Sequence, residues 1–473
     1  MKNIAVLILT VITNVSFGQT ESAASKTVTE TFIENYNTKE YKAIFSMFSS
    51  AMKETFPEDK TLEFLSSLQL QAGNITNHAF LKYEDKTYAS YKTTFERAIC
   101  TLKISIDEHS KINGLFVKPY VEEAASEGII NALSFEGDVL SKEQAALIFN
   151  STKVFPDQTQ IAFAIIKKGK VSFYGVKRKV DTLLTLDNHK SIFEIGSITK
   201  VFTSTLLSGF VVDEKVKLND NISSYLNFPL NNNVELSLKE LSNHTSGLAR
   251  LPSNLNLATA DITNPYKEYG ENELEEFLTK HVAIPQESIG HYQYSNLGAG
   301  LLGHVLSTIE GRSFENLLQD KIFSKYNMLN STSLQSKVAG VLVKGLNAQG
   351  NEVPNWEFSV LAGAGGILSS VEDLSKFALA QFESSNVALA LTRQKTFEIN
   401  DNMSIGLGWH IIKASNEDQW TWHNGGTAGY SSSMAIDVTN KNGVVILSNV
   451  SAFNPSMGNI DQLCFQLMKT LKE

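Results

Sequence analysis

The chain has 473 residues, a hydrophobic content of 42% and a formal net charge of −9 at pH 7. One ordinary core does not grow to this length, so the length predicts two domains. The negative charge excludes nucleic acid as the main partner, because nucleic acids are bound by basic surfaces.

Cysteine and histidine usage argues against disulfides and metal centres. The two cysteines, Cys100 and Cys464, are expected in different domains, where they behave as small buried hydrophobic residues. The nine histidines are scattered, and no two stand at the spacing of a helical zinc-binding pair. We therefore predict no metal and no cofactor.

Residues 1–18 have the pattern of a secretory signal peptide. Lys2 supplies a positive start, residues 4–15 form an apolar stretch, and small residues stand at 16 and 18. The stretch is too short to span a bilayer comfortably. We expect cleavage after Gly18, no integral membrane segment in the mature chain, and a secreted or periplasmic location in a bacterium.

Residues 22–120 are predicted to form a small α+β domain. Apolar residues at helical spacing predict three helices, the last of which ends near Gly73. Residues 100–106 alternate strictly, and the turn at 107–110 followed by 112–117 completes a hairpin. Helices first and a curved antiparallel sheet second resembles the cone-shaped nuclear transport factor 2-like domains. This resemblance implies a pocket or a dimer interface.

Residues 121–145 are mixed and acidic and are expected to form a linker. In the second domain, 146–473, hairpin patterns stand near both ends, at 161–176 and 431–448, and a helix closes the chain. This order predicts one antiparallel sheet assembled from both ends of the domain, flanked by helices and carrying an inserted helical lobe.

Ser197 and Lys200 lie at the start of a predicted helix, three residues apart. At that spacing both side chains share one helix face. A serine becomes a nucleophile when a neighbouring base takes its proton, and a desolvated lysine can be that base. Ser50 and Lys53 have the same spacing, but no buried helix follows them, so we interpret that pair as a solvated helix end.

Tyr294 and Asn296 precede a second apolar helical stripe. Nearby cations would lower the pKa of the Tyr294 phenol and let it act as a base. Asn296 has an amide that can orient Lys200 or bind a substrate amide. Considered alone, Tyr294 is more simply a half-buried aromatic residue.

His423, Gly425 and Gly426 stand just before the predicted strand at 431–437. Glycines there allow the backbone to approach a ligand, and Gly426 is the candidate for a backbone oxyanion donor. His423 is predicted to add a donor or a partial positive charge. The alternative is a glycine-rich turn with a solvent-facing histidine.

Together, the ordered motifs Ser-x-x-Lys, Tyr-Ser-Asn and His-x-Gly resemble the serine β-lactamase and penicillin-binding protein superfamily, in particular its class C, D,D-peptidase and esterase branch. Stretches around Glu194, His244, Gly365 and Trp409 share the likeness. The resemblance implies that Ser197 is acylated, Lys200 activates it and Tyr294 relays protons. It further implies substrate contacts from Asn296, His423 and Gly425, and an oxyanion hole from the backbone of Ser197 and Gly426, while His244 is structural.

One departure bears on the substrate. Class C enzymes carry Lys-Thr-Gly where this chain has His423-Asn424-Gly425, and a neutral imidazole holds a carboxylate less firmly than an ammonium. We therefore expect a serine hydrolase for esters, amides or D-amino-acid peptides, with β-lactams disfavoured. A second hypothesis is a non-catalytic cell-envelope protein that binds through this groove or through its N-terminal domain.

Overall fold

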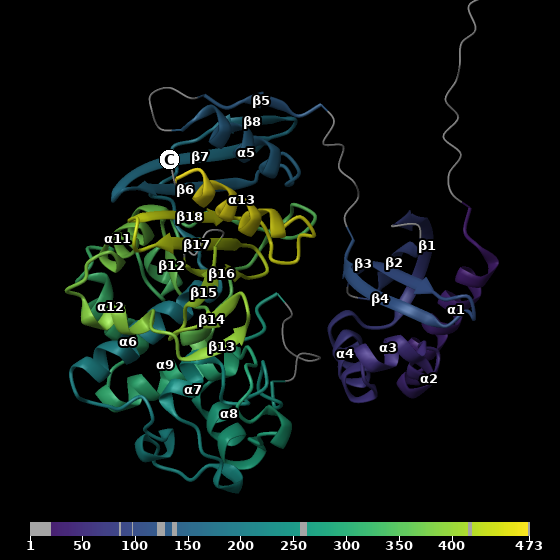
Figure 1. Cartoon of the computed structure of the whole chain (residues 1–473), viewed down its shortest axis with the longest axis horizontal. Helices are drawn as coiled ribbons and strands as arrows, with labels where there is room; N and C mark the ends of the chain where they lie inside the picture. Colours follow the sequence, from purple (N-terminus) through teal and green to yellow (C-terminus); the bar gives the residue numbers. More distant parts are fainter. Residues whose placement is uncertain are drawn as a thin grey trace, which may run out of the picture. The chain divides into compact units, whose positions relative to one another are not determined.

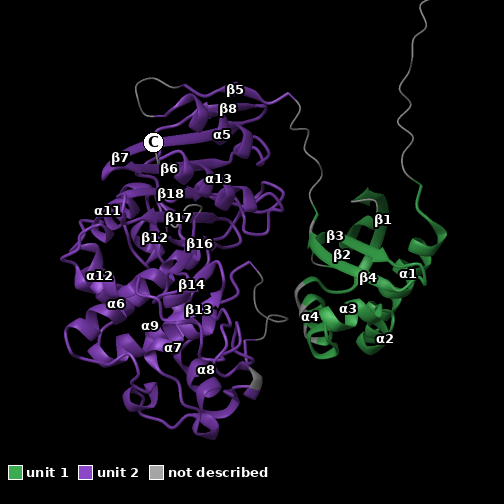
Figure 2. Cartoon of the chain, viewed as in Figure 1, with its two compact units in different colours: residues 1–120 green, residues 121–473 purple. Residues whose placement is uncertain are grey.

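The computed structural model (Figure 1) divides into two compact units, Met1–Tyr120 and Val121–Glu473 (Figure 2). The predicted signal peptide lies outside the described residues. None of the helices within those residues is both long and apolar enough to cross a membrane. The structure describes residues 20–84, 87–96, 98–120, 128–134, 140–255, 263–414 and 419–471.

The first unit carries its helices before its sheet, as predicted, but its described residues form four helices where three were predicted, because α3 is short and has no buried residue. The helices are α1 (Ala23–Asn37), α2 (Tyr41–Ser46), α3 (Ser50–Thr55) and α4 (Glu58–Ala72). The antiparallel strands follow in the order β1 (Ile75–Glu84), β2 (Tyr88–Phe95), β3 (Ile99–Ile106) and β4 (Ile112–Pro119). Phe32, Tyr36, Tyr91 and Leu102 share its core.

Two details of the first unit match their sequence patterns. Gly73 ends α4 with a φ of 80°, a conformation that glycine adopts without strain. Ser50 is exposed on the short helix α3, and the Lys53 ammonium lies over the ring of Phe45. The second Ser-x-x-Lys pair is thus a surface feature.

The second unit is built on a ten-stranded sheet in the order β13-β14-β15-β16-β17-β18-β6-β7-β8-β5 (Figure 1). Strand β6 pairs with β18 antiparallel, so both ends of the domain meet in the middle of the sheet, as predicted. The strands are β5 (Ile130–Ala132), β6 (Gln160–Lys167), β7 (Lys170–Lys179), β8 (Thr182–Thr185), β13 (Phe397–Asn400), β14 (Met403–Ile405), β15 (His410–Lys413), β16 (Gln419–Gly426), β17 (Ser431–Asp437) and β18 (Asn442–Ser448).

Both faces of this sheet are covered by helices. In β18, Val444 and Ile446 pack into the core beside α5 (Lys142–Thr152) and α13 (Gly458–Lys469), whereas Val445 and Leu447 pack into the core on the other side. Successive strand residues point to opposite faces, so a strand buried on both sides is apolar throughout.

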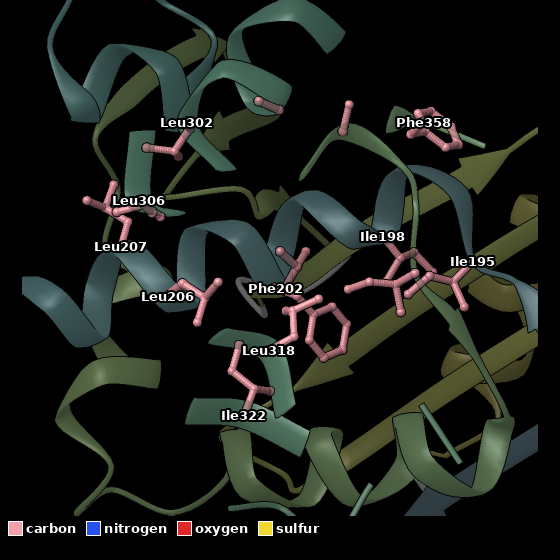
Figure 3. Packing of buried hydrophobic residues seen from close by; sticks show 14 of the residues in the cluster. Ile195, Ile198, Phe202, Leu206, Leu207, Leu302, Leu306, Leu318, Ile322 and Phe358 are labelled. Atoms are coloured by element: carbon pink, nitrogen blue, oxygen red, sulfur yellow. The ribbon is translucent and has the colours of Figure 1, made fainter. Parts of the chain in front are cut away.

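The helical lobe surrounds α6 (Thr199–Val212), which is buried along nearly its whole length. Figure 3 shows Phe202 beside Leu318 and Ile322, and Leu207 beside Leu302 and Leu306. This packing holds the start of α6 rigidly.

The other helices and short strands of the large unit are α7 (Leu238–Asn243), α8 (Glu271–Glu276), α9 (Asn296–Glu310), α10 (Phe314–Leu318), α11 (Val371–Gln381), α12 (Val387–Thr392), β9 (Phe193–Glu194), β10 (Gly345–Leu346), β11 (Glu352–Val353) and β12 (Leu368–Ser369).

The predicted linker at 121–145 differs from the structure over its described part. Strand β5 pairs with β8 in parallel, and Leu133 enters the core beside α5. A capping box at Ser141 then starts α5 at Lys142. This part of the segment therefore belongs to the large unit. Strand β5 could not be predicted from the sequence, because its three residues are all exposed and show no alternation of apolar and polar residues.

Candidate active site

The predicted nucleophile lies on a tight turn that leads into α6. Gly196–Ile198 form one 3₁₀ turn, and Ile195 and Ile198 on either side of the serine are fully buried. Gly196 has a φ of 51°, and a Cβ there would lie 2.6 Å from the Gly426 nitrogen. Only glycine fits this position. The turn leaves Ser197 half-buried and therefore within reach of a ligand.

Lys200 contacts the nucleophile directly. Its Nζ lies 2.9 Å from Ser197 Oγ and 2.7 Å from the Ala364 carbonyl oxygen, and the side chain is 2% exposed. Burial first, and the charge of Arg250 second, hold the pKa of Lys200 well below its usual value. A neutral amine has a lone pair that can accept the Ser197 proton.

Two basic side chains lie over the ring of Tyr294. Lys200 Nζ is 4.9 Å from its ring centroid, and Arg250 Cζ is 5.2 Å from it. Burial nevertheless raises the pKa of Tyr294 to about 12, and the lowering by Ser197 and Arg250 is smaller. The expectation that neighbouring cations would favour the phenolate is thus wrong, because desolvation dominates. Tyr294 is a protonated phenol that can donate.

Asn296 begins α9 and is 8% exposed. Its Nδ2 donates to the Tyr266 hydroxyl at 3.2 Å, and its Oδ1 has no hydrogen-bond partner in the described part of the chain. Lys200 instead bonds to Ser197 and Ala364. Of the two predicted roles, the structure does not show the orienting of Lys200, and the free acceptor suits a substrate N–H.

The end of β16 packs against the nucleophile turn. The Ser432 hydroxyl of the paired strand β17 donates to the Ile195 carbonyl oxygen at 2.8 Å. A Cβ on Gly425 would lie 2.0 Å from that oxygen and 2.8 Å from the Ser197 nitrogen. Gly425 therefore has no space for a side chain. The backbone nitrogens of Ser197 and Gly426, the two predicted oxyanion donors, both lie at this junction.

His423 is buried rather than solvent-facing, with 1% exposure. Its Nδ1 donates to the Asn424 carbonyl oxygen at 2.6 Å, and its ring centroid lies 6.4 Å from that of Tyr294. Burial holds the pKa of His423 well below its usual value, so the predicted partial positive charge is wrong. The imidazole is neutral, and its Nε2 has no partner among the described residues.

Two further histidines complete a buried aromatic group. His410 lies 5.3 Å from His423 between ring centroids and bonds to the Tyr292 hydroxyl at 2.9 Å. Burial lowers the pKa of His410 to about 4. His244 ends α7 in the left-handed conformation, and its Nδ1 accepts from the Ser295 backbone, which fits the predicted structural role.

Sequence reasoning did not identify Arg250, His410 or the buried acid Glu194 as parts of the site. Each of them lies in, or just after, a stretch that resembles the family: Glu194 in 193–196, Arg250 after 244–248 and His410 after Trp409. Their nearness to these stretches was the signal that could have identified them. Glu194 Oε1 accepts from Asn355 Nδ2 and from the Trp356 backbone, and burial raises the pKa of Glu194 to about 7.

Similarity to known proteins follows the division into two units. Residues 154–465 match the β-lactamase family, and residues 29–115 match a domain family of unknown function, DUF3887. The resemblance of the first unit to nuclear transport factor 2-like domains stays a prediction.

Curated relatives are distant. A β-lactamase of Pseudomonas fluorescens is 26% identical over 265 residues, which are 54% of this chain and 70% of that protein. A β-lactamase of Providencia stuartii is 28% identical over 270 residues, 55% of this chain and 64% of that protein. Protein flp of Staphylococcus aureus (strain MW2) is 24% identical over 316 residues, 61% of this chain and 59% of that protein.

Solved structures confirm the predicted fold of the large unit. A β-lactamase/D-alanine carboxypeptidase from Pseudomonas syringae superposes with a TM-score of 0.56 at 19% identity, covering 70% of this chain and 98% of that one. A class C β-lactamase from Rhodobacter sphaeroides gives a TM-score of 0.58 at 19% identity, with 70% and 99% covered. Since the family match extends over more than half of its residues, the chain belongs to the β-lactamase family.

Proposed function

We propose that the large unit is a serine hydrolase that acts through an acyl-enzyme on Ser197. The substrate is an ester, an amide or a D-amino-acid peptide. One observation carries the proposal: Ser197 Oγ lies 2.9 Å from the buried amine of Lys200, and burial holds the pKa of that amine well below its usual value. Membership of a family of hydrolases supports it.

Acylation would begin when the Ser197 hydroxyl passes its proton to Lys200 Nζ. Ser197 Oγ then bonds to the substrate carbonyl carbon, and the carbonyl electron pair moves to its oxygen. The backbone N–H groups of Ser197 and Gly426 would hold that oxyanion. Because the Ala364 carbonyl oxygen accepts from Nζ at 2.7 Å, it would also stabilise the new ammonium.

Tyr294 would complete the proton path. Its phenol, protonated at neutral pH, donates to the leaving oxygen or nitrogen as the tetrahedral intermediate collapses, and it regains a proton from Lys200. The acyl-enzyme remains until water attacks it, and the same groups then act in the reverse direction. The unpartnered Oδ1 of Asn296 would accept a substrate N–H beside the reacting bond.

Position 423 lacks the positive charge that a lysine would supply. A lysine would present a positive charge to the β-lactam carboxylate, whereas this imidazole is buried and uncharged. We favour a D,D-peptidase or esterase type of activity, in which any substrate carboxylate is bound by a group other than His423. The structural relative from Pseudomonas syringae carries both names, β-lactamase and D-alanine carboxypeptidase, and the second is in keeping with a D,D-peptidase.

Intact-mass spectrometry tests the proposal. The protein is incubated with a β-lactam, p-nitrophenyl esters and a D-Ala-D-Ala peptide, and we expect a covalent adduct that Ser197→Ala abolishes. Ser50→Ala is the matched control, because Ser50 has the same spacing to a lysine on an exposed helix. Absence of adduct and turnover with every compound would contradict the proposal.

The non-catalytic alternative makes the opposite prediction in cells. If the protein only binds a cell-envelope component, Ser197→Ala leaves the phenotype intact, whereas deletion of residues 22–120 abolishes it. We further propose a secreted or periplasmic location, from the expected signal sequence, and a dimer formed through the first unit. Fractionation and light scattering test these two proposals.

A further inference from the structure

We propose that Arg250 selects substrates that carry a carboxylate close to the bond being broken. This inference rests on the proposed hydrolase function and names the substrate class of the same site. The observations that carry it are the anchoring of the Arg250 backbone, the exposure of its unpaired guanidinium, and its contact with Tyr294.

The backbone of Arg250 is fixed at the start of α9. Its carbonyl oxygen accepts from the backbone nitrogens of Asn296 at 3.0 Å and Leu297 at 3.1 Å. The preceding carbonyl, that of Ala249, accepts from the Ser295 hydroxyl at 2.7 Å. The residue is therefore held beside Tyr294 and Asn296 before any ligand arrives, which lowers the entropic cost of binding.

The guanidinium itself is available to a ligand. Arg250 is exposed, and its side chain has neither an ion pair nor a hydrogen bond within the described ranges. Its Cζ lies 5.2 Å from the ring centroid of Tyr294, and Lys200 Nζ lies 4.9 Å from the same centroid. The guanidinium of Arg250 and the amine that contacts the nucleophile thus both lie over the ring of Tyr294.

The charge of Arg250 reaches the reacting groups. It contributes to lowering the pKa of Lys200 and of His244, although burial is the larger cause for both. Burial lowers the pKa of the other basic groups nearby, Lys200, His410 and His423, and so disfavours their charged forms. Arg250 is therefore the cation that this site offers to an anionic substrate.

A carboxylate is the group that fits this cation best. A guanidinium presents paired donors that match the two oxygens of a carboxylate, and it stays charged at every pH at which the enzyme works. Since the guanidinium lies over the same ring as the amine of Lys200, the carboxylate belongs to the part of the substrate next to the reacting carbonyl. The free acceptor of Asn296 adds a place for an amide N–H.

Two esters that share one skeleton test the inference. Mono-p-nitrophenyl glutarate carries a carboxylate, and its methyl ester is neutral. The readout is the ratio of their kcat/KM values. We expect the wild type to prefer the anion, and Arg250→Ala to lower the ratio about 10- to 100-fold. Arg250→Glu should lower it further, and added salt should reduce the wild-type ratio.

The matched control is Arg312→Ala, which removes an exposed arginine of the helical lobe that pairs with Asp320. This variant should keep the wild-type ratio. If Ser197 forms adducts but the ratio is the same in wild type and both Arg250 variants, the inference is wrong while the proposed function stands. If neither ester reacts while another compound of the wider panel forms a Ser197 adduct, the inference alone is wrong; absence of adduct and turnover with every compound overturns both.

Discussion

Replacement of Lys200 by methionine should inactivate the protein and stabilise it at the same time. Methionine has a similar volume and fits an apolar environment, but it cannot accept a proton. Loss of the general base should slow acylation about 10²- to 10⁴-fold. The gain in stability follows from the free-energy cost of keeping a buried lysine uncharged.

That cost depends on pH. The usual lysine pKa is 10.5, and burial lowers the pKa of Lys200 well below it. The unfolded chain therefore binds more protons than the folded one, so the stability of the wild type rises with pH within this window, by about 1.4 kcal/mol per unit. Holding the amine neutral therefore costs more folding free energy at pH 7 than at pH 9.

Methionine also loses two hydrogen bonds, to Ser197 and to the Ala364 carbonyl. At about 1 kcal/mol each, they offset part of the gain. The advantage of Lys200→Met over the wild type should therefore be largest at pH 7 and should shrink, by up to about 1.4 kcal/mol per pH unit, as the pH rises toward 9.

Urea unfolding followed by tryptophan fluorescence measures this difference. The four tryptophans, at 356, 409, 420 and 422, all lie in the large unit, so the signal reports on its unfolding. Lys280→Met, at a lysine whose side chain is 66% exposed, is the control and should show no such pH trend. A Lys200→Met protein that is less stable than the wild type by the same amount from pH 7 to 9 would refute the reasoning.

Two further predictions concern the neighbours of Ser197. Gly425→Ala should destabilise the large unit and abolish acylation, because the new Cβ would lie 2.0 Å from the Ile195 carbonyl oxygen. The control is Gly209→Ala, whose Cβ would meet no atom of a neighbouring element within 4 Å. This variant should behave like the wild type in the same urea and adduct assays. Burial raises the pKa of Glu194 to about 7, so the stability it gives is present below pH 4.5 and lost as the pH rises through 7. Between pH 4.5 and pH 8, the wild type should therefore lose about 3 kcal/mol that Glu194→Gln keeps, and parallel pH curves would contradict this.

The hairpins of the large unit could be predicted from the sequence, whereas its short strands could not. The hairpins at β6–β7 and β17–β18 carry apolar runs around a turn, and their pairing across the ends of the domain follows from connectivity. The short strands β5, β14 and β15 have three or four residues each, and their pairing depends on the rest of the sheet. No local pattern marks such strands.

Charge states were predictable only where burial and neighbouring charges act in the same direction. For Lys200, desolvation and Arg250 both lower the pKa, so the sequence expectation of a neutral amine agrees with the structure. For Tyr294 the two effects oppose each other, and burial is larger. Sequence shows which charged residues lie nearby in the chain, but the depth of a side chain is a tertiary property. The burial of His423 was missed for the same reason.

The charge states together explain how such a site would work at neutral pH. The amine of Lys200 and the imidazoles of His410 and His423 are neutral, and Tyr294 keeps its proton. Among these described groups, no ion pair has to be broken before Ser197 reacts. Charge would appear only as the oxyanion and the Lys200 ammonium form, and fixed backbone dipoles stabilise charges best where water is excluded. A permanent charge among the buried groups would alter the pKa values of Lys200 and Tyr294 before the reaction begins. Arg250 is exposed, so its charge can bind a substrate at the edge of the site.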